Sequence, residues 1–255
     1  MFMDAERKPA VATARQSLIP ALTGGAGKMF YLAFWLPVLW VLWGACFIFS
    51  AHFYPGYRIY NHDISDLGDP GMNSHGWRWW SLGMGIAGLM TFPPIAYASR
   101  RMEELTTGQA RGGIRLVALG SICMRCTCLG LMGLALVPQG SNLRDTIHTT
   151  SGVFAFGGEY VAFLFLWGVA LFKVREMSGA RLAFFTVSAW WAVAGFLATQ
   201  GYRFIAYGEL GHDVKHKGES ILLHFSLWEW MLFAAVTTSF AILVALLPVK
   251  VETDA

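Results

Sequence analysis

The sequence predicts an all-α fold, a polytopic transmembrane bundle of six helices with both termini cytoplasmic. Of the 255 residues, 55% are hydrophobic and only 14% are charged, whereas about one quarter of a soluble domain is charged. Six apolar stretches reach the roughly 20 residues that a helix needs to cross a bilayer. Because the segments between them are short, we expect a single transmembrane domain over 29–247, with an N-terminal cytoplasmic arm over 1–28 and a cytoplasmic tail over 248–255.

The N-terminal arm carries four basic residues but no apolar stretch that could serve as the core of a cleavable signal peptide, since 16–22 is too short. We therefore expect a loose or surface-lying arm that the mature protein retains. The first span, over about 29–51, is long enough to act as an uncleaved signal anchor. The remaining spans are expected over about 77–98, 113–137, 148–172, 182–206 and 220–247.

The orientation of these spans follows from the 19 Lys and Arg residues, because positively charged loops stay on the cytoplasmic side. With the N-terminus inside, the inner segments hold Arg7, Lys8, Arg15, Lys28, Arg100, Arg101, Arg111, Arg115, Lys173, Arg175, Arg181 and Lys250. The outer segments hold half as many, namely Arg58, Arg78, Arg144, Arg203, Lys215 and Lys217. We therefore expect an integral protein of a bacterial-type plasma (inner) membrane. The net charge of +3 suits contact with anionic membrane lipid and gives no reason to expect nucleic acid as a partner.

The histidines all fall on the outer side in this topology: His52, His62, His75, His148, His212, His216 and His224. The five aspartates other than Asp4 and Asp254, near the termini, lie there too, so any chemistry is expected at the outer end. The candidates for catalytic residues are His148, His224, Asp66 and Glu229. Each histidine can equally be an ordinary solvated residue.

Two histidine pairs suggest specific roles. His148 and His224 lie at similar depth in different spans, which suits a metal site, a proton relay, a pair of haem ligands, or interfacial aromatics that hold a headgroup. His212 and His216 have the spacing of a zinc-binding pair on one helix face. The glycines that flank this second pair argue against a helix there, so the metal signal is weak.

A charged residue, Arg125, interrupts the third span. It lies about 18 Å from the inner end of its helix, and Glu159 lies about 17 Å from the outer end of the fourth span, at roughly 1.5 Å per residue. Both therefore fall near the midplane of a core about 30 Å thick. Because an unpaired arginine there costs at least about 2.5 to 3.5 kcal/mol, we expect an intramembrane Arg125–Glu159 ion pair, with nearby glycines letting the helices approach. The pair would either fix helix packing or serve a proton path, an ion path or a buried ligand anchor.

Three cysteines surround Arg125, but only Cys123 and Cys126 share a helix face, and no second cluster completes a metal site. We expect them to be packing residues and expect no structural disulfide.

Glu229 is the other acid within a span and needs a partner unless it stays protonated. By depth alone, His148, Arg203, His224 and Glu229 could line one polar pocket.

The first outer loop, "YNHDISDLGDPG", followed by "WRWWSLGMGIAG", resembles a broad group of six-span proteins known as domain of unknown function 998, whose relatives include the FRAG, DRAM and Sfk type membrane proteins. Their mark is an Ile-Ser-x-Leu-Gly or Ile-Ser-Asp-x-Gly stretch after the first span, here residues 64–68. Two later features are compatible: a proline after the third span with a histidine that opens the fourth, and a glycine–acid pair followed by a tryptophan in the last span (Pro138, His148, Gly218, Glu219 and Trp228). Ser220, where a basic residue often stands, and the cysteine-rich third span with Arg125 depart from the pattern.

This resemblance implies six spans and an association with lipid remodelling, lipid organisation or membrane trafficking. The loop itself offers Asp63, Ser65 and Asp66 as ligand-binding candidates, together with Arg203 at the outer end of the fifth span. The loop oxygens either cap the second span and seal the bundle, or present carboxylates to a cation or headgroup.

Three functions stay open on the sequence. The first is lipid handling, by binding or by hydrolysis, at the outer leaflet. The second is a haem- or metal-binding subunit, and the third is a transporter or a structural subunit with membrane-protein partners. The sequence names no cofactor and does not decide whether the protein is an enzyme.

Overall fold

The computed structural model describes residues 19–59, 62–106, 111–137, 142–172 and 225–247. Every regular element in these ranges is helical, which confirms the all-α prediction. The elements are α2 (Lys28–Phe30), the π-helical turn η1 (Tyr31–Trp35), α3 (Leu36–Phe53), the 3₁₀ helix η2 (Ser65–Gly68), α4 (Trp77–Thr106), α5 (Arg111–Leu136), α6 (Asn142–Gly152), the π-helical turn η3 (Val153–Gly157), α7 (Gly158–Phe172) and α9 (Phe225–Leu246).

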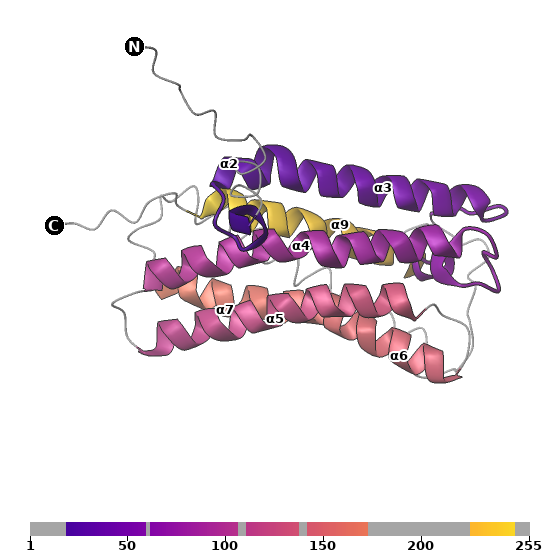
Figure 1. Ribbon diagram of the computed structural model, residues 1–255. Coiled ribbons are helices and arrows are strands. Elements are labelled where there is room, and N and C mark those ends of the chain that lie inside the picture. Colours follow the sequence, from indigo (N-terminus) through magenta and orange to yellow (C-terminus); the bar gives the residue numbers. More distant parts are fainter. Residues whose placement is uncertain (1–18, 60–61, 107–110, 138–141, 173–224, 248–255) are drawn as a thin grey trace, which may run out of the picture.

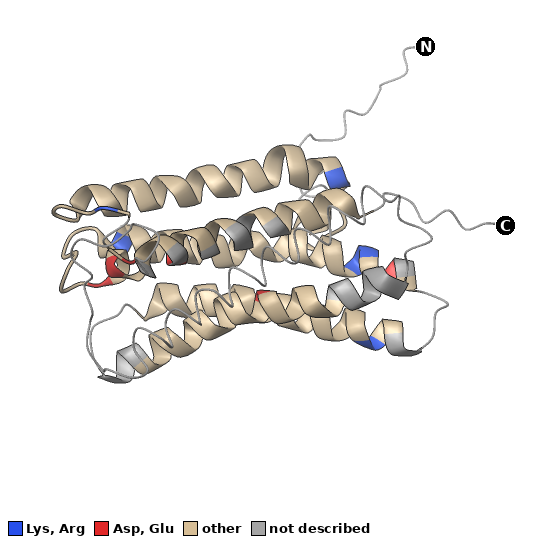
Figure 2. Ribbon diagram, turned by 180° about the vertical axis from the view of Figure 1, so that it is seen from behind, with Lys and Arg blue, Asp and Glu red and all other residues tan. Residues whose placement is uncertain are grey.

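The long helices lie side by side; α3, α4, α5 and the α6–α7 segment alternate in direction, and α9 runs parallel to α7 (Figure 1). At one end of the bundle the Lys28 ammonium donates to the carbonyl of Leu247 over 2.8 Å, so the first helix begins where α9 ends. Lysines and arginines gather there, and we call it the basic end: Lys28, Arg100, Arg101 and Arg115 (Figure 2). The opposite end, which we call the mouth end, is formed by the loop 54–76, the end of α5 and the starts of α6 and α9.

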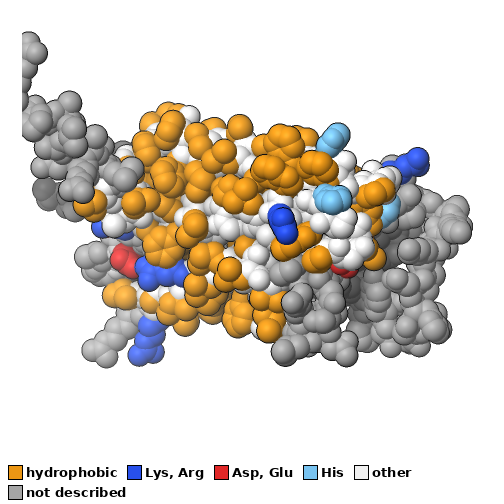
Figure 3. Space-filling model, turned by 45° about the vertical axis from the view of Figure 1, so that its right-hand side comes forward, with side chains coloured by type: hydrophobic (Ala, Val, Ile, Leu, Met, Phe, Trp, Pro, Cys, Tyr) orange, Lys and Arg blue, Asp and Glu red, His pale blue; other side chains and the backbone are white. Residues whose placement is uncertain are grey.

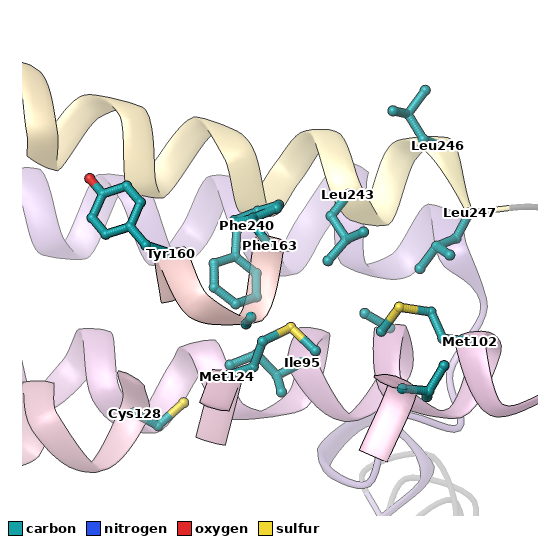
Figure 4. Close-up of a cluster of buried hydrophobic side chains, with 13 residues drawn as sticks. Ile95, Met102, Met124, Cys128, Tyr160, Phe163, Phe240, Leu243, Leu246 and Leu247 are labelled. Carbon is teal, nitrogen blue, oxygen red and sulfur yellow. The ribbon is translucent and has the colours of Figure 1, made fainter. Parts of the chain in front are cut away.

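Two clusters of buried apolar side chains hold the bundle together. The cluster toward the basic end joins α4, α5, α7 and α9 and includes Ile95, Met102, Met124, Cys128, Phe163, Phe240 and Leu243 (Figure 4). The cluster toward the mouth end joins α3, α4, α5 and α9 and includes Leu39, Trp43, Phe47, Trp80, Leu134 and Phe233. Ile64 and Leu67 of the loop belong to this second cluster, so the loop is packed into the bundle rather than extended into solvent.

Helices α5 and α7 approach closely through small residues. A methyl group at Gly130 would overlap the backbone nitrogen of Ala155, and one at Gly158 would lie 2.9 Å from the carbonyl oxygen of Cys123. Small residues allow this approach in membrane helices, where dispersion contacts rather than the hydrophobic effect drive association. The prediction that glycines permit close packing of the third and fourth spans is therefore confirmed.

The outer surface of the bundle is largely apolar. Val41, Ile48 and Leu129 keep 70%, 71% and 63% of their surface exposed, and orange hydrophobic side chains cover the flank in Figure 3. In a soluble monomer such a contiguous apolar surface is rare. Two helices of the described chain are long and apolar enough to cross a membrane, Lys28–Phe53 with a mean hydropathy of 2.1 and Gly113–Leu136 with 1.7. These observations support a membrane location.

Helix boundaries differ from the predicted spans in two places. Helix α4 continues to Thr106, eight residues past the predicted end, because the polar stretch after Ala98 still forms helix and Arg101 pairs with Glu104 one turn on. The fourth helical segment begins at Asn142 rather than at 148. Both differences arise because hydropathy marks the apolar part of a helix and not its polar termini. The predicted fifth span lies outside the described residues.

The last third of the N-terminal arm is not loose. Ala21 is buried and its carbonyl accepts a hydrogen bond from the Tyr31 hydroxyl over 2.7 Å. Gly24 has a positive φ of 77°, and a side chain there would overlap the backbone of Tyr97 in α4. Residues 19–27 therefore pack against the basic end of α4, which the sequence did not indicate.

Candidate functional site

The loop at the mouth end is held by one buried amide, Asn73. Its Nδ2 donates to the carbonyl of Ser50, to the Ser50 hydroxyl and to the carbonyl of Leu67, at 3.1, 3.1 and 3.0 Å. Its Oδ1 accepts from the backbone N–H of Gly76 at 3.0 Å, as an N-cap side chain does before a helix. Asn73 is fully buried. It therefore ties the end of α3, the 3₁₀ turn η2 and the start of α4 together, and it, rather than an aspartate, caps the second long helix.

A second contact fixes the same loop from the side of α6. A methyl group at Gly68 would lie 2.5 Å from the Trp80 ring, so only glycine lets the loop pack on this indole. The same indole stacks with the ring of His148 at a centroid distance of 5.7 Å. His148 Nδ1 donates to the carbonyl of Val137 over 3.1 Å. The structure thus places His148 as a buried residue that joins α6 to α4 and to the end of α5.

The loop is also bound to α9 by polar contacts, which bring predicted site residues together. The Ser226 hydroxyl donates to Asp63 Oδ1 over 2.6 Å, and the backbone N–H of Ile64 donates to Glu229 Oε2 over 2.7 Å. Trp230 Nε1 donates to the Tyr57 hydroxyl over 3.0 Å. These three bonds span more than 160 residues of sequence and place Glu229 beside the loop aspartates.

Aromatic rings border this group of acids. His62 stacks on Tyr57 at a centroid distance of 5.5 Å and meets Tyr54 edge-on at 5.1 Å, while the two tyrosine rings lie 5.4 Å apart. Asp66 accepts a hydrogen bond from the backbone N–H of Asp63 over 3.0 Å. We call the following set the mouth cluster: Tyr54, Tyr57, His62, Asp63, Asp66 and Glu229.

The electrostatics of the mouth cluster follow from burial and from like charge. Loss of solvent raises the pKa of Asp66 to about 6, and the negative charge of Asp63 adds to the effect. The backbone N–H of Asp63 and the nearby His62 oppose it. Burial is also the main cause that raises the pKa of the Tyr57 hydroxyl. The hydrogen bond from Trp230 lowers this pKa, and the negative charge of Glu229 raises it. Asp66 therefore changes its charge close to neutral pH, and the cluster becomes more negative as pH rises.

Several predicted site residues do not enter this cluster. Ser65 lies next to it in η2, half-buried, and His148 lies against Trp80. Arg203, His212, His216 and His224 lie outside the described residues, so the four-residue pocket and the zinc pair stay predictions. Within the described ranges, no group of three or more His, Cys, Asp and Glu side chains is arranged to hold a metal ion. Cys46, Cys123, Cys126 and Cys128 are all free thiols, and Cys46 and Cys128 are buried.

The predicted Arg125–Glu159 ion pair is wrong. Glu159 is fully buried and neither of its oxygens has a hydrogen-bond partner in the described chain, whereas Arg125 is exposed on the outer face of α5. The depths were right, because Gly158 packs on Cys123 and Thr127 at the level of Arg125. The directions were not: on α5 the side chains of Met124 and Cys128 turn inward, and Arg125 follows Met124 by a rotation of about 100°. Depth along a helix carries no information on its rotational phase.

Four residues of the mouth end escaped the sequence reasoning: Tyr57, Asn73, Ser226 and Trp230. The signal for Asn73 was present, since an asparagine just before an apolar span is a typical N-cap. Ser226, Glu229 and Trp230 stand at i, i+3 and i+4, which puts them on one helix face. Nothing in the sequence indicated that this face would meet the loop after the first span.

Comparison with known proteins adds no relative. No protein-family model, no curated protein and no solved structure matches the chain. The resemblance to the six-span group drawn from the loop residues therefore stays a prediction.

Proposed function

We propose that the chain is an integral membrane protein with six spans, and that its mouth end faces outward and binds a lipid headgroup. The apolar flank and the two candidate spans support insertion. The concentration of Lys and Arg at the opposite end supports the orientation, since such residues stay cytoplasmic. Helix α7 ends at the basic end and α9 begins at the mouth end (Figure 1). The apolar stretch 182–206 between them fits an alternating six-span chain.

The chemistry of the mouth cluster favours a headgroup with an ammonium group, such as ethanolamine or choline. Three carboxyl groups, those of Asp63, Asp66 and Glu229, lie within electrostatic reach of Tyr57, and the ring of Tyr54 lies beside it. Carboxylates attract a cation, and the faces of aromatic rings stabilise it further, by about 0.5 to 2 kcal/mol each. This convergence of acids and rings at the outward end is the single observation that carries the proposal. The proposal is one of binding, and it assigns no catalytic step.

The proposal is tested by native mass spectrometry of the full-length protein, offered phosphatidylethanolamine, phosphatidylcholine and phosphatidylglycerol in separate experiments. We expect retention of the two ammonium lipids and much less of phosphatidylglycerol. Asp66→Asn and Glu229→Gln are expected to reduce that retention several-fold.

The matched control is Asp69→Asn, which removes a carboxylate from the same loop. Among the bonds described, the Asp69 side chain accepts a hydrogen bond only from the backbone N–H of Gly71, within its own turn. This variant should retain lipid like the wild type. Equal binding of all three lipids, or equal retention by all three variants, would contradict ammonium recognition at the mouth cluster.

A further inference from the structure

Glu159 stands apart from the mouth cluster, in the middle of the bundle. Its side chain has no exposed surface, and both carboxyl oxygens lack a hydrogen-bond partner among the described residues. Buried carboxyl groups in proteins are nearly always bonded, because an unbonded polar group loses its hydration without compensation. A fully buried acid without a partner therefore calls for an explanation.

The surroundings of Glu159 contain no described cation. Helix α5 presents Cys128, which lies close enough to interact electrostatically with Glu159, and Cys123, whose carbonyl contacts Gly158. Tyr160 is the neighbouring titratable group on α7 itself. Tyr160 and Cys128 belong to the buried apolar cluster toward the basic end, to which α4 and α9 contribute Ile95 and Phe240 (Figure 4). The guanidinium of Arg125 lies on the opposite face of α5 and does not reach this space.

The backbone beside Glu159 is also irregular. The π-helical turn η3, Val153–Gly157, ends just before Gly158, where α7 packs closely on α5. Single π-helical turns within helices are rare, and they occur frequently at functional sites. The irregular turn thus lies directly beside the buried acid, two residues before it in the chain.

We propose that Glu159 is a proton-binding site inside the bundle, neutral at rest, which exchanges its proton when water or a polar ligand enters between α5 and α7. In the apolar interior of the bundle, an isolated carboxylate has a far higher free energy than the neutral acid, because it has neither water nor a counter-ion. Buried acids of this kind in membrane helices mark proton or ion paths. The site is independent of headgroup binding at the mouth cluster and gives the chain one group able to carry a proton in its interior.

The test is infrared spectroscopy of the full-length protein in lipid at alkaline pH, where surface carboxylates and Asp66 are ionised. We expect a C=O stretching band of a protonated carboxylic acid, which shifts in deuterated water and disappears in Glu159→Gln. Glu229→Gln is the matched control and should leave this band unchanged. The band is first read in the wild type, so the test does not depend on folding of a variant. A wild-type spectrum with no such band, or a band that survives in folded Glu159→Gln, overturns the proposal.

A second readout uses dicyclohexylcarbodiimide, an apolar reagent that modifies protonated carboxyl groups. The carboxyl oxygen bonds to the central carbon of the reagent and its proton moves to a nitrogen, so the whole reagent is added without a leaving group. We expect peptide mass mapping to find the adduct on Glu159. Labelling should fall at strongly alkaline pH, where water enters the bundle and the Glu159 carboxyl group becomes ionised. Labelling at Glu159 that increases with pH would show an ionised nucleophile instead and would count against the proposal.

Discussion

The exposed position of Arg125 leads to a quantitative prediction that is opposite in sign to that of an ion pair. Arg125 lies near the middle of α5, and its neighbours on the same outer face, Ile122 and Leu129, are 56% and 63% exposed. In a membrane these side chains face lipid. An arginine at the centre of a lipid-facing helix costs about 2.5 to 3.5 kcal/mol on insertion scales, and a leucine there gains about 0.3 to 0.6 kcal/mol. Arg125→Leu should therefore favour insertion by about 3 to 4 kcal/mol, on the order of 100- to 1000-fold.

The assay places residues 111–137 in a host membrane protein with glycosylation sites on both flanks and measures the inserted fraction. The same substitution is then made in the full-length protein, and its thermal unfolding is measured in lipid. We expect a higher inserted fraction and an unchanged or higher unfolding temperature. Arg115→Leu is the matched control, because Arg115 is also exposed but lies at the basic end, where a charge costs little.

The ion-pair alternative makes the opposite prediction for the full-length protein. Removing one partner of a buried pair leaves the other charge uncompensated and destabilises by about 3 to 5 kcal/mol. A loss of that size in Arg125→Leu, rescued by adding Glu159→Gln, would refute the placement of Arg125 on the outer face.

Three further predictions follow from the contacts. Asn73→Asp keeps the cap on α4 but removes the amide donor to two buried carbonyls, which should destabilise by about 1 to 3 kcal/mol per unmade bond and lower the unfolding temperature. Gly130→Val should separate α5 from α6 and the η3 turn and abolish cooperative thermal unfolding, whereas Gly44→Val, at a position with nothing within 4 Å, should unfold like the wild type. Binding of ammonium lipids should weaken as pH falls through about 6, because Asp66 loses its charge there, and Asp66→Asn should bind equally weakly on both sides of that pH.

The sequence predicted those features that depend on hydropathy and on local chemistry. Long apolar stretches were enough to locate the described helices, and the aspartates after the first span were enough to identify the polar loop. Gly130 and Gly158 were recognised as contact points, because glycine within an apolar helix has few other uses. Depth along the spans grouped Glu229 with other polar residues of the outer end, but not with the loop after the first span.

The sequence failed where rotational phase and tertiary contact decide. In a soluble helix the polar face reveals which side is buried, but α5 is apolar on the packed face and on the outer face alike, so periodicity could not orient Arg125. The partnership of Tyr57 with Trp230 joins segments 173 residues apart and has no local signal. The π-helical turn before Glu159 is equally invisible, because "VFAFG" would form an ordinary helix as readily.

The most direct test of the whole account is the sidedness of its two ends in intact cells. The four native cysteines lie in α3 and α5, so a single cysteine introduced at an exposed position gives a clean signal with a membrane-impermeant maleimide. His75→Cys, in the loop of the mouth end, should react from outside. Glu104→Cys, at the basic end of α4, should react only after the membrane is made permeable. Labelling of Glu104→Cys in intact cells together with protection of His75→Cys would invert the molecule and contradict an outward-facing headgroup site.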